Sequence, residues 1–279
     1  MTVRVVSDTA CDLPQPLADE LGIVLVPLHV RFGAAELVDR EQLSTKEFWD
    51  RCARSGSLPE TAAPSPGAFV GVFEALAGSG ADGVVCVTLS SKLSASSEAA
   101  KQAAKELGDF PVRVVDSLSV TLGEGMVCLA AAEVAAAGGG IEAVEAAAGA
   151  TRGKLSVFGA IDTLENLRKG GRIGGAAAAL GTLLSIKPVI EVRNGVVEQE
   201  SRQRTRAKSL RYLADKVRSV APVERLAIMS ANAPDLGEFL DMLGEVASDH
   251  ERLLGDIGPV VGTHAGPGAI GVGWVRRGP

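Results

Sequence analysis

The sequence predicts an α/β protein of two domains, a parallel-sheet domain at residues 1–152 and a second α/β domain at residues 153–279. Three observations predict this fold class. The chain of 279 residues can bury two modest cores. Apolar residues make up 46% of it and aromatic residues only 4%, so the cores are built mainly from Val, Leu, Ile and Ala. Short β-rich runs alternate with alanine-rich stretches of helical periodicity, which is typical of α/β layers.

Three β-rich runs in the first half each end in hydroxyl or carboxyl side chains. They lie at residues 3–6, 84–89 and 112–115. Between the second and third runs, residues 94–107 repeat alanine and leucine at helical spacing with charges on the opposite face, which predicts a β-α-β unit. Ligands of open parallel sheets bind beyond the carboxyl ends of the strands, so a site is expected near these polar clusters.

The chain from residue 123 onward predicts a further set of elements. Residues 123–150 are expected to form two helices separated by Gly138–Gly140, and the domain boundary follows near residue 152. The turn Asn194-Gly195 predicts a hairpin. The remaining expectations are a strand at 155–160, a short helix from a capping residue Asp162 to Gly170, a packed helix at 174–186, strands at 186–192 and 196–201, a helix at 205–217, a strand at 225–230, a helix at 236–246, and a strand-loop-strand at 258–275.

Charge and composition argue against several classes of protein. The formal net charge is −6, and the Lys and Arg residues are spread along the chain, so nucleic acid is not an expected partner. No segment reaches the roughly 18 uninterrupted apolar residues of a membrane span, and the N-terminus does not resemble a secretion signal, so a cytoplasmic protein is expected. The scattered cysteines are expected to be reduced and structural: Cys11, Cys52, Cys86 and Cys128.

Motifs for nucleotide and metal binding are weak or missing. Gly266, Gly268 and Gly271 have the spacing of a dinucleotide-binding loop, but only eight residues follow, too few for the helix that this motif needs. The chain has no phosphate-binding loop, so any ATP chemistry is expected on another protein. Three dispersed histidines do not suggest a metal site.

The serine, histidine and arginine side chains allow several hypotheses about a functional site. The serines at residues 90–97 can cap a helix or bind a ligand. Ser94 and His264 could serve an acyl hydrolase or transferase, although the nucleophile-elbow motif is missing. Arg172, and the alternating Arg202, Arg204 and Arg206, can be solvated or can bind an anion or an acidic partner.

Six segments in order along the chain resemble the DegV family. The resemblance implies a two-domain α/β protein with a fatty acid in a tunnel between the domains, acting as the lipid-binding subunit of a bacterial fatty acid kinase. The segments are SDTACDLP from residue 7, TAAPSPGAF from 61, TLSSKLSASSEAA from 88, VVDSLSVTLGEG from 114, DTLENLRKGGRIGGAAAALGTLLSIKPV from 162, and GTHAGPGAIGV from 262.

Carried over position by position, the resemblance implies that the fatty-acid carboxylate is bound by Thr61, Ser94, Arg172 and His264. It implies that this chain has no resident cofactor and no turnover of its own, that a partner kinase supplies ATP and Mg²⁺, and that any membrane contact is transient. Arg202 and Arg204 are expected to contact the partner or the incoming phosphate. A lipid-sensing regulator is an alternative. The chain departs from the usual family pattern at Ala62, Ala63, Ala95 and Gly174.

Overall fold

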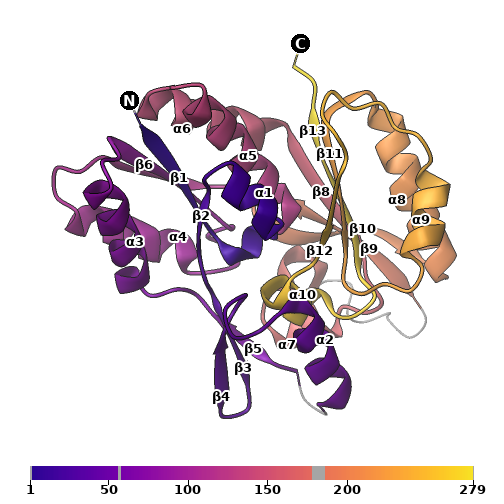
Figure 1. The fold of residues 1–279 in the computed structure, drawn as a ribbon. Helices are drawn as coiled ribbons and strands as arrows, with labels where there is room; N and C mark the ends of the chain where they lie inside the picture. The colour runs from indigo at the N-terminus through magenta and orange to yellow at the C-terminus, as the bar shows by residue number, and fades with distance from the viewer. Residues whose placement is uncertain (1, 56–57, 178–185, 279) are drawn as a thin grey trace.

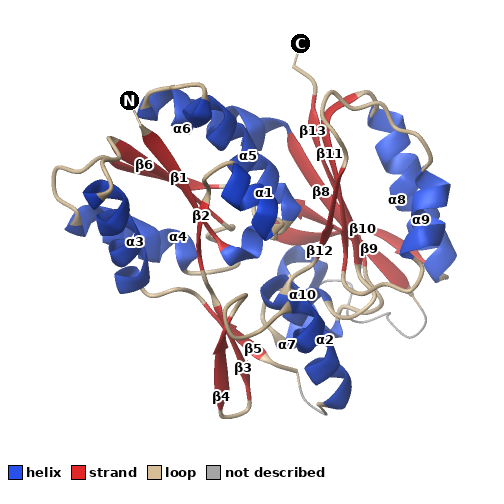
Figure 2. Ribbon diagram, in the orientation of Figure 1, coloured by secondary structure: helices blue, strands red, loops and turns tan. Residues whose placement is uncertain are grey.

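The computed structural model describes residues 2–55, 58–177 and 186–278 and contains three β-sheets with helices around them (Figure 1). Figure 2 shows a parallel sheet with its helices on one side of the molecule, a larger sheet on the other, and a small sheet that projects below them. The predicted α/β class with an N-terminal parallel sheet is confirmed.

The N-terminal sheet consists of four parallel strands in the order β2-β1-β6-β7. Alternate residues face opposite sides: Val6 and Val84 pack against α3 and α4, whereas Val5 and Val85 join the core that includes α5. Both faces are therefore covered, as a parallel sheet requires. The elements are β1 (Val3–Asp8), η1 (Thr9–Cys11), α1 (Gln15–Glu20), β2 (Val24–Val26), α3 (Pro66–Gly78), β6 (Gly83–Thr88), α4 (Ser96–Glu106), β7 (Val112–Asp116), α5 (Leu122–Ala136) and α6 (Ile141–Lys154).

The second large sheet has six strands in the order β10-β9-β8-β13-β11-β12, antiparallel except for the pair β11 and β12. Helices α8 and α9 cover one face, where Phe158 and Trp274 are stacked with ring centroids 5.0 Å apart. The other face meets α5, which contacts strands of both large sheets. The elements are β8 (Leu155–Ala160), β9 (Lys187–Arg193), β10 (Val196–Gln203), α8 (Arg206–Val220), β11 (Val223–Ser230), α9 (Leu236–Leu243), β12 (Leu253–Asp256) and β13 (Ile270–Arg276).

A small antiparallel sheet and three helices complete the structure near the ends of the two large sheets. This small sheet, in the order β4-β3-β5, was not predicted from the sequence. Helix α10 contacts α2 as well as strands β3 and β5 of this sheet. The close approach depends on Gly262, because a Cβ there would lie 2.9 Å from the Trp49 ring and 3.0 Å from the Phe48 ring. The elements are β3 (His29–Phe32), β4 (Ala35–Val38), α2 (Thr45–Arg54), β5 (Glu60–Ala62), α7 (Glu165–Lys169) and α10 (Pro259–Ala265).

Two local predictions are wrong. The first strand expected within residues 258–275 is the helix α10, with Pro259 in its first turn and Gly266, at φ +81°, directly after its end. A seven-residue apolar run fits either structure, so its periodicity could not distinguish them. Asp162 does not cap α7: Thr163 Oγ1 accepts the Glu165 N–H at 3.1 Å, and Asp162 instead pairs with Lys187 at 3.1 Å.

The remaining elements lie close to their predicted positions. The helix pair around Gly138–Gly140, the hairpin at Asn194-Gly195 and the predicted strands are present. The packed helix expected at residues 174–186 falls largely outside the described residues. The domain boundary expected after residue 152 falls in the last turn of α6, and the division into domains stays a prediction.

Candidate functional site

A cavity of about 190 Å³, called the polar cavity because of the four side chains that follow, lies where the two large sheets, the small sheet and α10 meet. Its polar lining side chains are Thr61, Ser94, Arg172 and His264. The structure thus brings together four residues from four separate segments: β5, the loop between β6 and α4, the segment after α7, and α10. The apolar lining residues are Leu28, Ala62, Ala63, Leu89, Leu93, Ala95, Val120, Leu167, Ile190, Val192, Val197, Val260, Val261 and Ala265.

Thr61 and His264 are in direct contact. The Thr61 Oγ1 and His264 Nε2 atoms are 3.0 Å apart, whereas His264 Nδ1 is buried and has no hydrogen-bond partner among the described residues. A buried N–H without an acceptor is costly, so we assign the proton to Nε2, which donates to Thr61 Oγ1. The hydroxyl hydrogen of Thr61 then remains available for an anionic ligand.

His264 is held in place by a close contact with the end of α7. A Cβ on Gly170 would lie 2.2 Å from His264 Nδ1, so only glycine leaves room for the imidazole. Burial, followed by the positive charge of Arg172, lowers the pKa of His264 to about 4. The imidazole is therefore neutral near pH 7 and acts as a hydrogen-bonding group rather than a second cation.

Ser94 lies at the N-terminal end of α4. Its Oγ is 3.1 Å from Ser96 Oγ and accepts the Ser96 N–H at 3.3 Å. Ser94 and the N-cap residue Ala95 both line the cavity, so the N-terminal end of α4, which carries the positive end of the helix dipole, lies beside it. Ser90, in the same cluster, is structural, because its Oγ donates to the Gly195 carbonyl at 2.7 Å.

Arg172 supplies positive charge to the cavity. Its Nε donates to the Leu93 carbonyl at 3.0 Å, and its Nη1 donates to the Gly170 carbonyl at 2.6 Å. The bond to Leu93 ties the segment after α7 to the loop that carries Ser94, and the bond to Gly170 stays within that segment. They hold the guanidinium at the cavity, and Nη2 has no hydrogen-bond partner in the described parts of the chain.

A second, almost wholly apolar cavity of about 60 Å³ lies beside the first, on the face of the larger sheet. The two cavities share lining residues from three segments: Val120, Ile190, Val192, Val261 and Ala265. The four polar side chains line only the first cavity. The combined space therefore suits an elongated amphipathic molecule, with its polar end beside Arg172 and its apolar end on the sheet.

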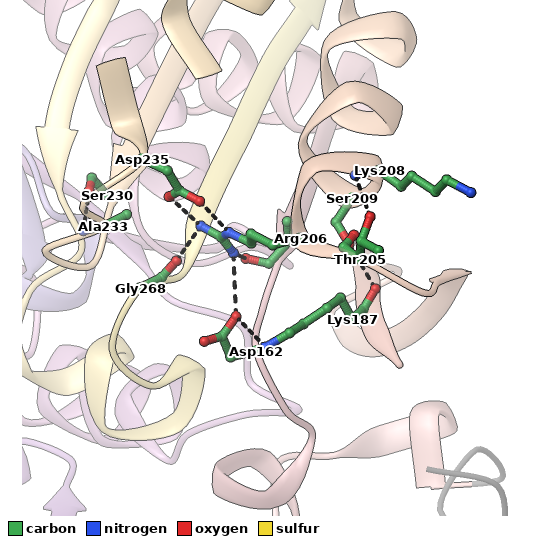
Figure 3. A network of polar contacts seen from close by, with 11 residues as sticks. Asp162, Lys187, Thr205, Arg206, Lys208, Ser209, Ser230, Ala233, Asp235 and Gly268 are labelled. Carbon is green, nitrogen blue, oxygen red and sulfur yellow. Dashed lines mark hydrogen bonds and ion pairs between the residues drawn. The ribbon is translucent and has the colours of Figure 1, made fainter. Parts of the chain in front are cut away.

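Arg202 and Arg204 do not line either cavity. Both are exposed, Arg202 near the end of β10 and Arg204 just beyond it. Arg206, the third arginine of the alternating series, begins α8 and is a structural residue: its guanidinium binds Asp235 and the Gly268 carbonyl (Figure 3). The three arginines therefore do not form one binding face.

The polar residues that end β1 have a structural role. The Asp8 carboxylate accepts the Ala10 N–H at 3.1 Å and the Leu89 N–H at 3.0 Å, which joins the ends of β1 and β6. Burial is the main cause that raises the pKa of Asp8 to about 7. Of the strand ends expected to form a site, the one after β6 lines the cavity through Leu89, Leu93 and Ser94.

The pattern of contacts does not favour a Ser94–His264 hydrolase. In the described part of the chain, Ser94 Oγ pairs with Ser96 and His264 Nε2 pairs with Thr61, so the two side chains have different partners. A nucleophilic serine needs the imidazole within hydrogen-bonding reach. Among the described residues, no group of three or more His, Cys, Asp or Glu side chains is arranged to hold a metal ion.

No helix within the described ranges is both long and apolar enough to span a bilayer. Fold and cavity together define an α/β protein with an enclosed site among three sheets, lined by apolar and a few polar side chains. Residues 2–277 match the family described as "Uncharacterised protein, DegV family", and the chain belongs to the DegV family.

Relatives and solved structures agree with this membership. A DegV domain-containing protein of Streptomyces coelicolor is 35% identical over 279 residues, covering 97% of each chain. A DegV family protein from Thermus thermophilus, described by its fatty acid binding, has a TM-score of 0.90 at 32% identity and covers 99% of this chain and 100% of its own. DegV of Bacillus subtilis, described as a fatty acid binding protein, has a TM-score of 0.86 at 28% identity and covers 99% of this chain and 100% of its own.

The depressed pKa of His264 leads to a prediction about stability. Between pH 6.5 and about 4 the unfolded chain binds a proton at His264 that the folded protein does not, so stability falls as pH falls. From pH 7 to pH 5 we expect the wild type to lose about 2 kcal/mol more unfolding free energy than His264→Gln. Urea unfolding followed by circular dichroism would measure this difference, and parallel pH profiles of the two proteins would contradict it.

Proposed function

We propose that this protein binds one long-chain fatty acid in the joined cavities and presents its carboxylate to a separate ATP-dependent kinase, which converts it to an acyl phosphate. The observation that carries the proposal is the polarity of the site: the first cavity places Thr61, Ser94, Arg172 and His264 together, and an almost wholly apolar cavity lies beside it. The descriptions of the Thermus thermophilus and Bacillus subtilis proteins as fatty acid binding support the choice of ligand.

The apolar part of the site can supply most of the affinity. Burying about fourteen methylenes at roughly 0.8 kcal/mol each contributes on the order of 10 kcal/mol before the cost of association. A carboxylate that leaves water needs donors and a positive charge. The Arg172 guanidinium, the hydroxyls of Thr61 and Ser94, and the dipole of α4 provide them, so the headgroup is oriented as well as neutralised.

The geometry also favours presentation of the headgroup. Ala62 and Ala95 line the polar cavity and are exposed, so this end of the site opens toward the surface, whereas the apolar end is covered by the larger sheet and α10. A partner that carries ATP and Mg²⁺ could reach the carboxylate there. On this proposal the protein acts in the cytoplasm as a carrier, without a resident cofactor and without turnover of its own.

We also propose that Arg202 and Arg204 help to bind the partner or the incoming phosphate. They are exposed on or beside β10, the strand whose Val197 lines the polar cavity. Arg202 is five residues farther along, roughly 17 Å in an extended strand. That distance suits contact with a second protein seated over the opening rather than contact with the carboxylate itself.

The purified protein is expected to yield one fatty acid per chain on extraction with organic solvent, identified by mass spectrometry. Loaded protein incubated with ATP and Mg²⁺ should form acyl phosphate only when a fatty acid kinase is added. Arg202→Ala/Arg204→Ala should reduce this transfer by about tenfold, as expected when one or two exposed charge contacts are lost. Arg211→Ala, an exposed arginine of α8, is the control.

Two results would contradict parts of this proposal. A protein that neither carries nor takes up fatty acid would rule out the ligand, and turnover without a partner would rule out the carrier role. Undiminished transfer by the double variant would remove only the role of Arg202 and Arg204.

A further inference from the structure

A row of four paired residues crosses the face of the larger sheet that lines the second cavity. Ile190 on β9 pairs with Gly159 on β8, Gly159 pairs with Gly271 on β13, and Gly271 pairs with Met229 on β11. Directly paired residues point to the same side of a sheet. The two middle strands therefore have no side chain in this row. Ile190 and Met229 flank a stretch of exposed backbone at Gly159 and Gly271, which we call the glycine floor.

The backbone does not explain these two glycines. Neither Gly159 nor Gly271 has a positive φ, and glycine inside a strand costs stability through its extra freedom in the unfolded chain. Helix packing explains Gly273, the next residue on the same side of β13, because a Cβ there would lie 3.0 Å from Met126 Cε of α5. No helix atom is among the nearest neighbours of a Cβ at Gly159 or Gly271, so helix packing does not explain these two glycines.

Space for a ligand explains both glycines. Both glycines line the second cavity, together with Ile190 and Met229. A Cβ on Gly159 would be 3.5 Å from Ile190 Cγ1, and one on Gly271 would be 3.3 Å from Met229 Cε. The nearest backbone atoms, the carbonyl oxygens of Ile270 and Phe158, would be 3.8 and 3.5 Å away, so methyl groups fit without moving the backbone and would occupy part of the cavity.

We propose that Gly159 and Gly271, with Met229 as an adaptable side wall, set the longest acyl chain that the site accepts. This inference rests on the proposed function and adds a position for the distal end of the chain. The carboxylate lies at the polar cavity, and the end of the chain reaches the glycine floor. Methionine suits the wall because its unbranched thioether adjusts to the occupant.

The test compares the binding of stearate and decanoate to delipidated protein by isothermal titration calorimetry. Gly159→Ala/Gly271→Ala should weaken stearate binding by about tenfold, because roughly two methylenes lose their place, and should leave decanoate binding unchanged. Met229→Ala should shift the preference in the opposite direction and provides an independent check if the double variant folds poorly. Gly149→Ala is the control, since a Cβ there meets no atom within 4 Å.

The outcomes separate this inference from the proposed function. The role of the glycine floor would be overturned if the double variant lost affinity for both acids equally. It would also be overturned if the ratio of stearate to decanoate affinity stayed unchanged in both the double variant and Met229→Ala. In either case wild-type binding of fatty acid, and with it the proposed function, would be unaffected. Wild-type protein that bound neither acid would overturn the proposed function and this inference with it. A selective loss of stearate binding in the double variant supports both.

Discussion

Replacing Arg172 with methionine is expected to weaken fatty-acid binding by roughly 100-fold. Methionine keeps much of the side-chain length but removes the positive charge at the cavity. The carboxylate would then be bound by hydroxyls and the α4 dipole alone, and loss of one member of a desolvated charge pair typically costs about 2–5 kcal/mol. Calorimetric titration of delipidated protein with a long-chain fatty acid would measure the change.

Two comparison variants separate loss of charge from loss of structure at Arg172. Arg168→Met is the control, because Arg168 lies in α7 and pairs with Glu165 at 2.7 Å, outside the cavity. Arg172→Lys should recover part of the affinity, since lysine keeps the charge but not the geometry of the two bonds to backbone carbonyls. Fatty-acid binding that is equal in wild type and Arg172→Met, with both proteins folded, would remove Arg172 from the carboxylate site.

Replacing Arg206 with methionine is expected to lower the free energy of unfolding by about 3 kcal/mol, since both the arginine and its main partner are largely buried. The Arg206 guanidinium donates to both Asp235 oxygens, at 2.8 and 3.0 Å, and to the carbonyls of Ala160 and Gly268 (Figure 3). Its loss would leave the Asp235 carboxylate without its charge partner. The expected fall in melting temperature is roughly 10 °C.

The Arg206 network also anchors a segment next to the site. The Arg206 guanidinium binds the carbonyl of Gly268, which lies in the loop after the helix that carries His264. A double variant, Arg206→Met/Asp235→Leu, should regain part of the stability by removing the stranded carboxylate. Arg211→Met on the exposed side of α8 is the control and should change stability little. Equal melting temperatures for Arg206→Met and Arg211→Met would show that the network contributes nothing.

Much of the fold could be predicted because the signals are local. The alanine spacing of α4, the glycines between α5 and α6, and the Asn194-Gly195 turn act over a few residues, and all of these elements are present. The errors come from short segments. The run around Val260 is apolar enough for a strand, but it forms the helix α10, which packs against α2 across Gly262.

The sequence alone determined the α/β class and the parallel N-terminal sheet, and its resemblance to a family singled out four polar residues that the structure places around one cavity. Tertiary structure decided that Thr61 and His264, which are 203 positions apart, are in contact. It also placed Ser94 at the cavity and Ser90 in a structural hydrogen bond. In the alternating series it gave Arg206 a structural ion pair and left Arg202 and Arg204 exposed. The physical reason is range: a helix or turn depends on neighbouring residues, whereas a cavity depends on which distant side chains leave space when sheets and helices pack together.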